Sequence, residues 1–341
     1  MTLETLVRKM PKVELHVHLE GSIRPETVLE LARRNNVALP ADTVEDLREW
    51  YDFRDFPHFV EVYVEVSKCI RTADDLELIA REFLKGQADQ NVLHTEVTYT
   101  ASTIEKYAAI PWPEQRDALR RAIAFGKEEL GVTCRVVLDV VRGDSPERGE
   151  EVARWALDAT DIVVALGLSG EERLGGPEEY ASAIEIALDG GLAFVPHAGE
   201  TVGPESIRAC LPFRPARIGH GVRAIDDGKL VAELRDKGIP LEVCPTSNVR
   251  LGVYPSLEEH PFPRLMDEGC FVTINSDDPP MFGTSITNEL LRSAETFELS
   301  PDILYTLTMN AVHASLLPVA EKNELRRRIR QEWPEDDEEE E

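Results

Sequence analysis

Cysteine, basic residues and long apolar runs are all scarce in this chain of 341 residues. The five cysteines are widely spaced and form no CxxC pair, so we expect no disulfide framework and a reducing compartment. No apolar run approaches the roughly 20 residues that span a bilayer, and the N-terminus lacks the apolar core of a signal peptide. We therefore expect a cytoplasmic protein.

Positive charge is also scarce, because 37 basic residues face 64 acidic ones and the formal net charge is −27. A nucleic-acid partner requires a basic face that neutralises phosphates, and an anionic membrane repels an acidic protein. We expect neither partner, and composition leaves the oligomeric state open. The last seven residues are all acidic, and we expect residues 331–341 to form a solvated, disordered tail.

Short apolar segments that resemble strands alternate along the chain with segments of helical periodicity. Continuous apolar strands are typical of parallel sheets that are covered on both faces. The alternation predicts an α/β fold with one domain over residues 1–330, a (β/α)8 TIM barrel, and a doubly wound open sheet is the alternative. The predicted strands are 13–19, 92–98, 133–140, 162–168, 193–197, 217–220, 241–244 and 271–276. The predicted helices are 25–35, 73–90, 113–130, 146–160, 178–189, 204–211, 226–237 and 261–268.

The connection between the first two predicted strands contains an extra insertion, residues 39–69. Long connections at the carboxyl face of a barrel commonly form lids or pocket walls. Packing on the barrel exterior is the alternative for the whole insertion. Phe53, Phe56 and Phe59 could cover a hydrophobic pocket above the sugar, and packing along a helix face would equally explain their spacing. We expect a helical insertion after strand one in either role. Its aromatic residues are Trp50, Tyr51, Phe53, Phe56, Phe59 and Tyr63.

Histidines and carboxylates collect at the ends of the predicted strands. His16 and His18 are two residues apart on one strand, so their side chains point to the same side. His197 and His220 end two later strands, and Asp277 follows the last one. The carboxyl ends of barrel strands share one face, where active sites lie. Nitrogen and oxygen ligands without sulfur suit zinc, with iron or manganese as alternatives, so we predict a mononuclear metal site.

Two further carboxylates lie close to these strand ends. Glu200 is three residues beyond His197, where it can face a pocket without binding the metal. Asp278 adjoins Asp277, and burying both carboxylates costs free energy unless they bind a metal or form hydrogen bonds. A helix cap or turn before Pro279 is the alternative for this pair. The histidines without such a context, which we expect to be structural or at the surface, are His58, His94, His260 and His313.

In combination, these motifs resemble the adenosine deaminase family of the amidohydrolase superfamily. The set of HxH, HAGE, GHG and SDDP is highly specific, and the resemblance spans residues 11 to 313. It implies one zinc ion per chain and hydrolytic deamination of a 6-aminopurine. The matching stretches are PKVELHVHLEGSIRPETVLELA, NVLHTEVTYT, VVALGLSGEE, FVPHAGE, RIGHGV, LEVCPTSN and TINSDDPPMF.

The resemblance also implies a role for each site residue. Glu200 corresponds to the acid that protonates purine N1, and His220 to the residue that orients the attacking water and assists its deprotonation. Asp278 corresponds to the group that binds purine N7, and the Gly170 N–H to the group that meets N3. His18 also lies among the substrate-binding residues. The implied zinc ligands are His16, His18, His197 and Asp277.

The chemistry of the reaction supports these roles independently. Displacing an aromatic amine requires a strong nucleophile, and a zinc ion lowers the pKa of water toward about 7. The ring resists attack at C6 unless a ring nitrogen is protonated, and a buried carboxylic acid with a raised pKa can supply that proton. Zinc deaminases of the cytidine type require a PCxxC motif, and here Cys244 and Pro245 are followed by Thr246 and Ser247.

Glu20 departs from the family pattern, since adenosine-specific members carry Asp there, and that acid meets the 5′-hydroxyl of the sugar. Adenine-specific relatives share HLEG, but they usually show a GLDSSE-like stretch on strand four. This chain has GLSGEE, which is closer to the LAGDE of the nucleoside type. We therefore expect Glu20 at the ribose end and adenosine or 2′-deoxyadenosine as substrate. Adenine and a 5′-modified adenosine such as aminodeoxyfutalosine are the alternatives.

Two other classes of function remain to be compared with a deaminase. Metal-barrel hydrolases of esters, lactones or amides often use a second metal bridged by a lysine on strand four, and residues 161–170 contain no lysine. A catalytically inactive relative would lack Glu200, His220 or a metal ligand, and the chain retains all of them. Both comparisons favour a one-metal deaminase.

Overall fold

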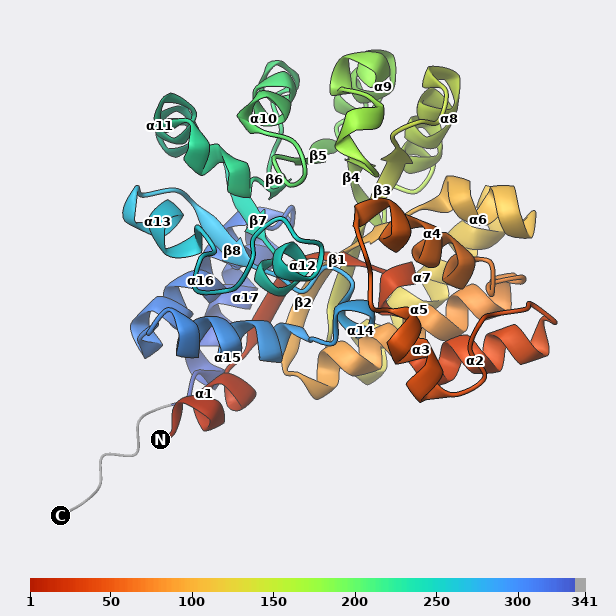
Figure 1. Cartoon of the computed structure of the whole chain (residues 1–341), viewed down its shortest axis with the longest axis horizontal. Coiled ribbons are helices and arrows are strands. Elements are labelled where there is room, and N and C mark those ends of the chain that lie inside the picture. The colour runs from red at the N-terminus through yellow and green to blue at the C-terminus, as the bar shows by residue number, and fades with distance from the viewer. Residues whose placement is uncertain (335–341) are drawn as a thin grey trace.

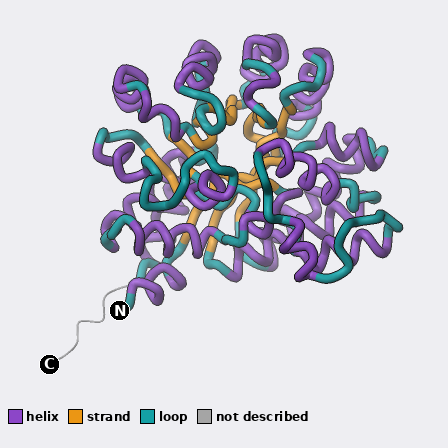
Figure 2. The backbone as a smooth tube through the Cα atoms, viewed as in Figure 1, coloured by secondary structure: helices purple, strands orange, loops and turns teal. Residues whose placement is uncertain are grey.

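Eight parallel strands follow one another in chain order around a barrel in the computed structural model, which describes residues 1–334. The strands occupy the centre of the molecule and helices surround them (Figures 1 and 2). The predicted (β/α)8 TIM barrel is confirmed, and the open sheet is excluded by the sequential strand order. The strands are β1 Lys12–His18, β2 Val92–Tyr99, β3 Thr133–Val141, β4 Val163–Ser169, β5 Ala193–Ala198, β6 Ile218–His220, β7 Leu241–Val243 and β8 Val272–Ile274.

The barrel closes between β8 and β1 through hydrogen bonds made by residues that follow the end of β8. The His18 N–H donates to the Asp277 carbonyl at 2.9 Å, and the Asp277 N–H donates to the His16 carbonyl at 3.1 Å. Asn275 Oδ1 accepts hydrogen bonds from the Leu15 and His16 N–H groups at 2.9 and 3.2 Å. β8 is therefore shorter than the predicted 271–276. Because His16, His18 and Asp277 make the closing contacts, closure also aligns the strand ends that carry the predicted ligands.

The helices cover the outside of the barrel, and several begin where the sequence supplies a cap. α5 starts after Thr72, whose side chain and that of Asp75 form a capping box. α11 begins at Gly228, later than predicted, because the Asp227 side chain accepts the first free N–H groups. The helices outside the insertion are α1 Leu3–Lys9, α2 Pro25–Arg34, α5 Ala73–Asp89, α6 Ala101–Ala108, α7 Trp112–Glu129, α8 Pro146–Leu157, α9 Ala181–Asp189, α10 Pro204–Cys210, α11 Gly228–Lys237, α12 Pro245–Arg250, α13 Phe262–Asp267, α14 Pro279–Phe282, α15 Ile286–Thr296, α16 Pro301–Ala314 and α17 Val319–Glu332.

The C-terminal boundary differs from the sequence expectation in one respect. α17 continues to Glu332, so residues 331 and 332, assigned to the acidic tail, are helical. The expected disorder of the tail falls mainly on residues 335–341, which lie outside the described residues. Within residues 1–334, no helix has both the length and the apolar composition needed to cross a membrane. All five cysteines are buried free thiols.

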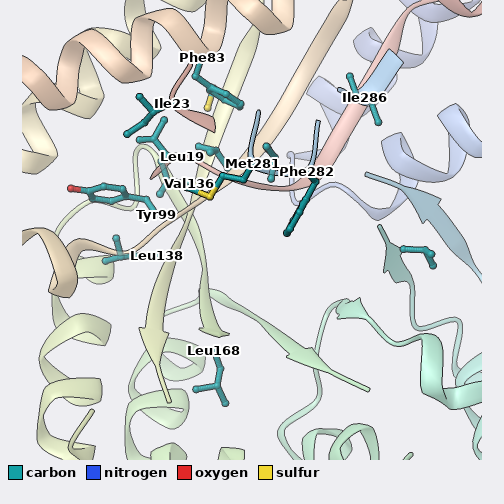
Figure 3. Packing of buried hydrophobic residues seen from close by; sticks show 14 of the residues in the cluster. Leu19, Ile23, Phe83, Tyr99, Val136, Leu138, Leu168, Met281, Phe282 and Ile286 are labelled. Atoms are coloured by element: carbon teal, nitrogen blue, oxygen red, sulfur yellow. The ribbon is translucent and has the colours of Figure 1, made fainter. Parts of the chain in front are cut away.

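The insertion after β1 forms two helices, α3 Val44–Trp50 and α4 Phe56–Ser67. α3 begins with a capping box formed by Thr43 and Asp46, and Asp55 caps α4. Apolar side chains between the strands and the surrounding helices form one large core cluster. Figure 3 shows part of it, where Phe282 of α14 lies close to Met281 and Leu19 follows β1. Phe59 of α4 packs against Phe282 with ring centroids 5.2 Å apart, which fixes the insertion on the barrel face.

Candidate active site and metal centre

Four side chains that the sequence analysis placed at one barrel face converge in the structure. Their ligand atoms all lie within 4.8 Å of one another, and the four residues are buried. His18 Nε2 is 3.1 Å from His197 Nε2 and 3.3 Å from Asp277 Oδ1. His16 Nε2 is 3.5 Å from Asp277 Oδ1. The four residues are His16, His18, His197 and Asp277.

The chemistry of these donors fits a metal ion. His16 Nε2 is fully buried, yet it has no hydrogen-bond partner among the described residues. A buried polar atom without a partner carries a cost of about 1–3 kcal/mol, which a bound cation would remove. Three imidazole nitrogens and one carboxylate oxygen are the ligand types of zinc, iron and manganese sites. The cluster is therefore a site able to hold a metal.

His16 is oriented from behind by a carboxylate that the sequence analysis did not single out. Glu242 Oε2 lies 2.9 Å from His16 Nδ1, so a proton on Nδ1 is held there and Nε2 is left for a metal. Glu242 also pairs with Arg217, whose guanidinium lies 2.7 Å from Glu96. All of these side chains are buried. The sequence feature that could have identified Glu242 is an ionisable residue within a short, otherwise apolar strand.

Two residues of the site have a strained backbone. His220 and Asp277 adopt left-handed conformations with φ of 59° and 64°. Such a conformation costs a non-glycine residue on the order of 1–3 kcal/mol, and it persists only where the surroundings enforce it. Gly219 allows the close approach, because a Cβ there would lie 2.7 Å from His16 Cε1. The glycine before His220 is thus required by the close approach of the His16 imidazole.

Ser247 of α12 supports Asp277 from the other side. Its hydroxyl donates to Asp277 Oδ2 at 2.7 Å, while Oδ1 faces His16 and His18. Burial by itself would raise the pKa of Asp277, but the neighbouring imidazoles of His16 and His18 outweigh it and hold this pKa well below its usual value. Asp277 is therefore an ionised carboxylate, the form that binds metals.

Glu200 follows β5 in a loop that a second carboxylate holds in place. Glu172 Oε1 accepts the N–H groups of Glu200 and Thr201 at 2.9 and 2.7 Å, and its Oε2 accepts the Gly199 N–H at 2.8 Å. Sequence reasoning missed Glu172, which lies within the GLSGEE stretch without any helical or strand periodicity to mark it. This loop aims the Glu200 side chain into the site.

The Glu200 side chain is buried, and its protonation state follows from that burial. Burial, together with the charges of Asp277 and Glu172, raises the pKa of Glu200 well above its usual value. Its Oε2 lies 3.7 Å from His220 Nε2. Burial lowers the pKa of His220 to about 3. Burial thus favours the protonated form of Glu200 and the neutral form of the His220 imidazole.

Asp278 is a second buried acid of the site. Its Oδ1 is buried and has no hydrogen-bond partner among the described residues. Burial and the neighbouring Asp277 raise the pKa of Asp278 well above its usual value. A Cβ on Gly21 would lie 1.6 Å from Asp278 Oδ1, so only glycine at position 21 allows the carboxyl group to lie there. Asp278 can therefore offer a proton to a ligand.

One cavity of about 670 Å³, a volume that includes its open mouth, is bordered by six of the site residues: His18, His197, Glu200, His220, Asp277 and Asp278. Gly170, with φ of 83°, lines it at the end of β4. The insertion supplies an apolar wall, so it acts as a pocket wall, while Phe53 packs edge-on against Phe59 with centroids 5.3 Å apart. Phe56 and Phe59 therefore line the cavity, and Phe53 packs against this wall. The residues that α4 contributes to the wall are Phe56, Phe59, Val60, Tyr63 and Val64.

Glu20 is fully buried beside this cavity. Its Oε1 accepts the Thr100 N–H at 3.0 Å, and its Oε2 accepts the Tyr63 hydroxyl at 3.2 Å. Thr100 and Tyr63 both line the cavity, whereas Glu20 is not among the lining residues. Burial raises the pKa of Glu20 to about 7. The structure therefore places Glu20 in contact with the cavity wall.

The four histidines expected outside the metal site lie outside the four-ligand cluster. His94 is buried and contacts Thr133 at 2.8 Å and Glu96 at 3.4 Å. His313 is exposed, and His58 lies near the start of α4. His260 is buried near α12 and α13, where it contacts Asn248 at 3.1 Å.

Comparison with known proteins shows the family of this chain. The family model described as "Adenosine deaminase" matches residues 11–332. The chain belongs to the adenosine deaminase family. The sequence-based prediction of an aminohydrolase, a hydrolase of C–N bonds, is confirmed at the level of this family.

The relatives of this member of the adenosine deaminase family include adenine deaminases and aminodeoxyfutalosine deaminases. An aminodeoxyfutalosine deaminase of Streptomyces avermitilis is 39% identical over 326 residues, which cover 94% of this chain and 90% of the relative. An adenine deaminase of Chelativorans sp. is 38% identical over 309 residues, covering 90% and 94%. The crystal structure of an adenine deaminase from Arthrobacter aurescens superposes with a TM-score of 0.90 at 29% identity, covering 94% of this chain and 98% of that one.

Proposed function

We propose that this member of the adenosine deaminase family hydrolyses the 6-amino group of a purine nucleoside, with adenosine and 2′-deoxyadenosine as first substrates. Inosine or its 2′-deoxy form and ammonia are the products. The observation that carries the proposal is the buried carboxyl group of Glu200, which lines one cavity together with His18, His197 and Asp277 of the four-ligand cluster. One zinc ion per chain would be held there and would supply water acidic enough to attack at neutral pH. Its ligands in this proposal are His16, His18, His197 and Asp277.

The remaining steps belong to the side chains of the cavity. Glu200, protonated because it is buried, gives its proton to ring N1 while water adds to C6. His220 lies 3.7 Å from Glu200 Oε2, where it orients the attacking water. Asp278 donates to N7 through the oxygen that has no partner among the described residues, and the Gly170 N–H meets N3. The proton that water loses on addition returns to the Glu200 carboxylate. The hydroxyl proton of the C6 adduct then passes to the amino nitrogen as the bond between C6 and that nitrogen breaks, so ammonia leaves and N1 of the product keeps its proton.

The wall of the cavity favours a second candidate for the group at N9. Both Glu20 oxygens accept hydrogen bonds from the protein, and the neighbouring wall includes Phe56, Phe59 and Leu251. Apolar lining favours a substrate whose N9 group is extended by an apolar 5′-substituent or is absent. A 5′-modified adenosine such as aminodeoxyfutalosine, or free adenine, is therefore the second candidate. In either case the partner is a small-molecule purine.

A substrate panel tests the proposal. Zinc-loaded protein is assayed for ammonia release from adenosine, 2′-deoxyadenosine, adenine, 5′-methylthioadenosine and aminodeoxyfutalosine at equal concentration. We expect turnover of at least one nucleoside, with loss of activity after chelation and recovery when zinc is added. Higher kcat/KM for adenine or aminodeoxyfutalosine would select the second candidate. Failure on every 6-aminopurine with zinc bound would contradict the reaction class.

A further inference from the structure

A chain of three hydrogen bonds leads from a backbone amide to the imidazole of His220. The Phe262 N–H donates to His260 Nδ1 at 3.2 Å. His260 Nε2 lies 3.1 Å from Asn248 Oδ1, and Asn248 Nδ2 lies 3.2 Å from His220 Nδ1. All three side chains are buried, with relative exposures of 3% for His260, 0% for Asn248 and 1% for His220. This series of hydrogen bonds is therefore shielded from water, which could otherwise replace one of the hydrogen-bonding partners.

The Phe262 amide at one end of the series determines which atom donates in each of the three hydrogen bonds. An amide N–H can only donate, so His260 Nδ1 must present a lone pair. A neutral imidazole with a lone pair on Nδ1 carries its proton on Nε2, and His260 therefore donates to the carbonyl oxygen of Asn248. The amide NH2 of Asn248 then faces His220 and donates to Nδ1. Burial lowers the pKa of His260 to about 3, which keeps this imidazole neutral.

We propose that Asn248 and His260 are positioning residues that fix His220 in the tautomer with its proton on Nε2. His220 Nε2 faces the reaction site, 3.7 Å from Glu200 Oε2 and 3.9 Å from Asp277 Oδ2. In this tautomer His220 presents an N–H, and no lone pair, to the carboxylates and to the attacking oxygen, so it can orient the attacking water but does not take its proton, which differs from the assisting role that the family resemblance implies. The consequence for catalysis rests on the proposed deaminase function, whereas the tautomer itself does not.

The tautomer can be measured directly in the zinc-loaded enzyme without a substrate. Histidine is labelled with ¹⁵N, and long-range proton–nitrogen correlations distinguish protonated from unprotonated ring nitrogens. The His220 signals are assigned from their loss in His220→Gln. We expect an unprotonated Nδ1 and a protonated Nε2. A protonated Nδ1 in the wild-type enzyme would overturn the proposal, whether or not any purine is turned over.

Substitutions then test whether Asn248 sets this state. Asn248→Asp replaces the donor that faces His220 with an acceptor of the same shape, so Nδ1 of His220 should become protonated. We expect kcat to fall about 10- to 100-fold, as for other residues that orient a catalytic group. KM should change by less than about threefold, because substrate contacts are retained. An unchanged tautomer with unchanged kcat would contradict the role of Asn248, and if this variant does not fold, the wild-type spectrum decides alone.

A matched pair at position 260 separates positioning from packing. His260→Gln retains an N–H that can reach Asn248 Oδ1, whereas His260→Leu fills the space without a donor. We expect kcat of the Gln variant to stay within about threefold of wild type and that of the Leu variant to fall about tenfold. His313→Leu, a change at an exposed histidine, is the control. Equal kcat losses in both position-260 variants would show a packing role and overturn the proposal for His260.

Discussion

The hydroxyl of Tyr63 donates a hydrogen bond to Glu20 at 3.2 Å and so joins the inserted helix α4 to the end of β1. Tyr63 is part of the cavity wall, and Glu20 has Thr100 as its second partner. The residue expected at the ribose end thus touches the cavity through an aromatic ring that belongs to the insertion. This contact makes the wall of the substrate pocket dependent on a buried carboxyl group.

Removing the Tyr63 hydroxyl should weaken both stability and substrate binding. In Tyr63→Phe one oxygen of buried Glu20 loses its donor, and we expect the free energy of unfolding to fall by about 1–3 kcal/mol. KM for nucleosides should rise more than kcat falls, because the wall shifts while Glu200 and His220 remain in place. Urea unfolding and steady-state kinetics measure the two effects.

A control for this substitution is Tyr305→Phe in α16, outside the cavity. It makes the same chemical change, and we expect nearly unchanged stability and KM. If Tyr63→Phe behaves like this control, the bond to Glu20 does not hold the cavity wall.

Loss of the acidic proton at Glu200 should reduce turnover without releasing the metal. Glu200→Gln retains the shape of the side chain but cannot give a proton to the ring, so we expect kcat to fall by about 10²–10⁴-fold. Zinc content, measured by elemental analysis, should remain near one per chain because Glu200 is not in the four-ligand cluster. Glu205→Gln, at an exposed position on α10, is the control and should be fully active. Full activity of Glu200→Gln would refute its role as the acid.

Lys12 should make stability depend on pH. Its ammonium group is buried and donates to the carbonyls of Met10 and Gln90, both at 2.9 Å. Burial, with Arg8 nearby, lowers the pKa of Lys12 from 10.5 to about 7. Between these values the unfolded chain binds the proton that the folded protein lacks, so the free energy of unfolding rises with pH from about 7 to 10.5 and this gain is lost as pH falls through 7.

The measurement compares two lysine variants. Urea unfolding at pH 7, 8 and 9 should show a slope on the order of 1 kcal/mol per pH unit that Lys12→Met removes. Lys229→Met, at an exposed position, should retain the wild-type slope. Equal slopes in wild type and Lys12→Met would show that Lys12 titrates normally in the folded protein.

Several features of the site connect residues far apart in the chain, and sequence reasoning did not find them. Glu242 contacts His16 across 226 positions, and Asn248 links His220 to His260 across 28 and 12 positions. Neither Glu242 nor Asn248 has a local spacing that marks its partner. The helix predicted to begin at residue 226 begins at Gly228, because the Asp227 side chain, and not hydrophobic periodicity, decides where α11 starts.

The amino-acid sequence by itself determined the barrel and the set of residues at its carboxyl face. Periodicity identifies strands and helices locally, and parallel strands in a barrel necessarily end on the same face, so His16, His18, His197 and Asp277 could be grouped before any coordinates were known. Only the tertiary structure decided which atoms face one another and which protons they carry. Burial and hydrogen bonding depend on contacts between distant segments, and these contacts determine the protonation of Glu200, the orientation of His220 and the partners of Glu20.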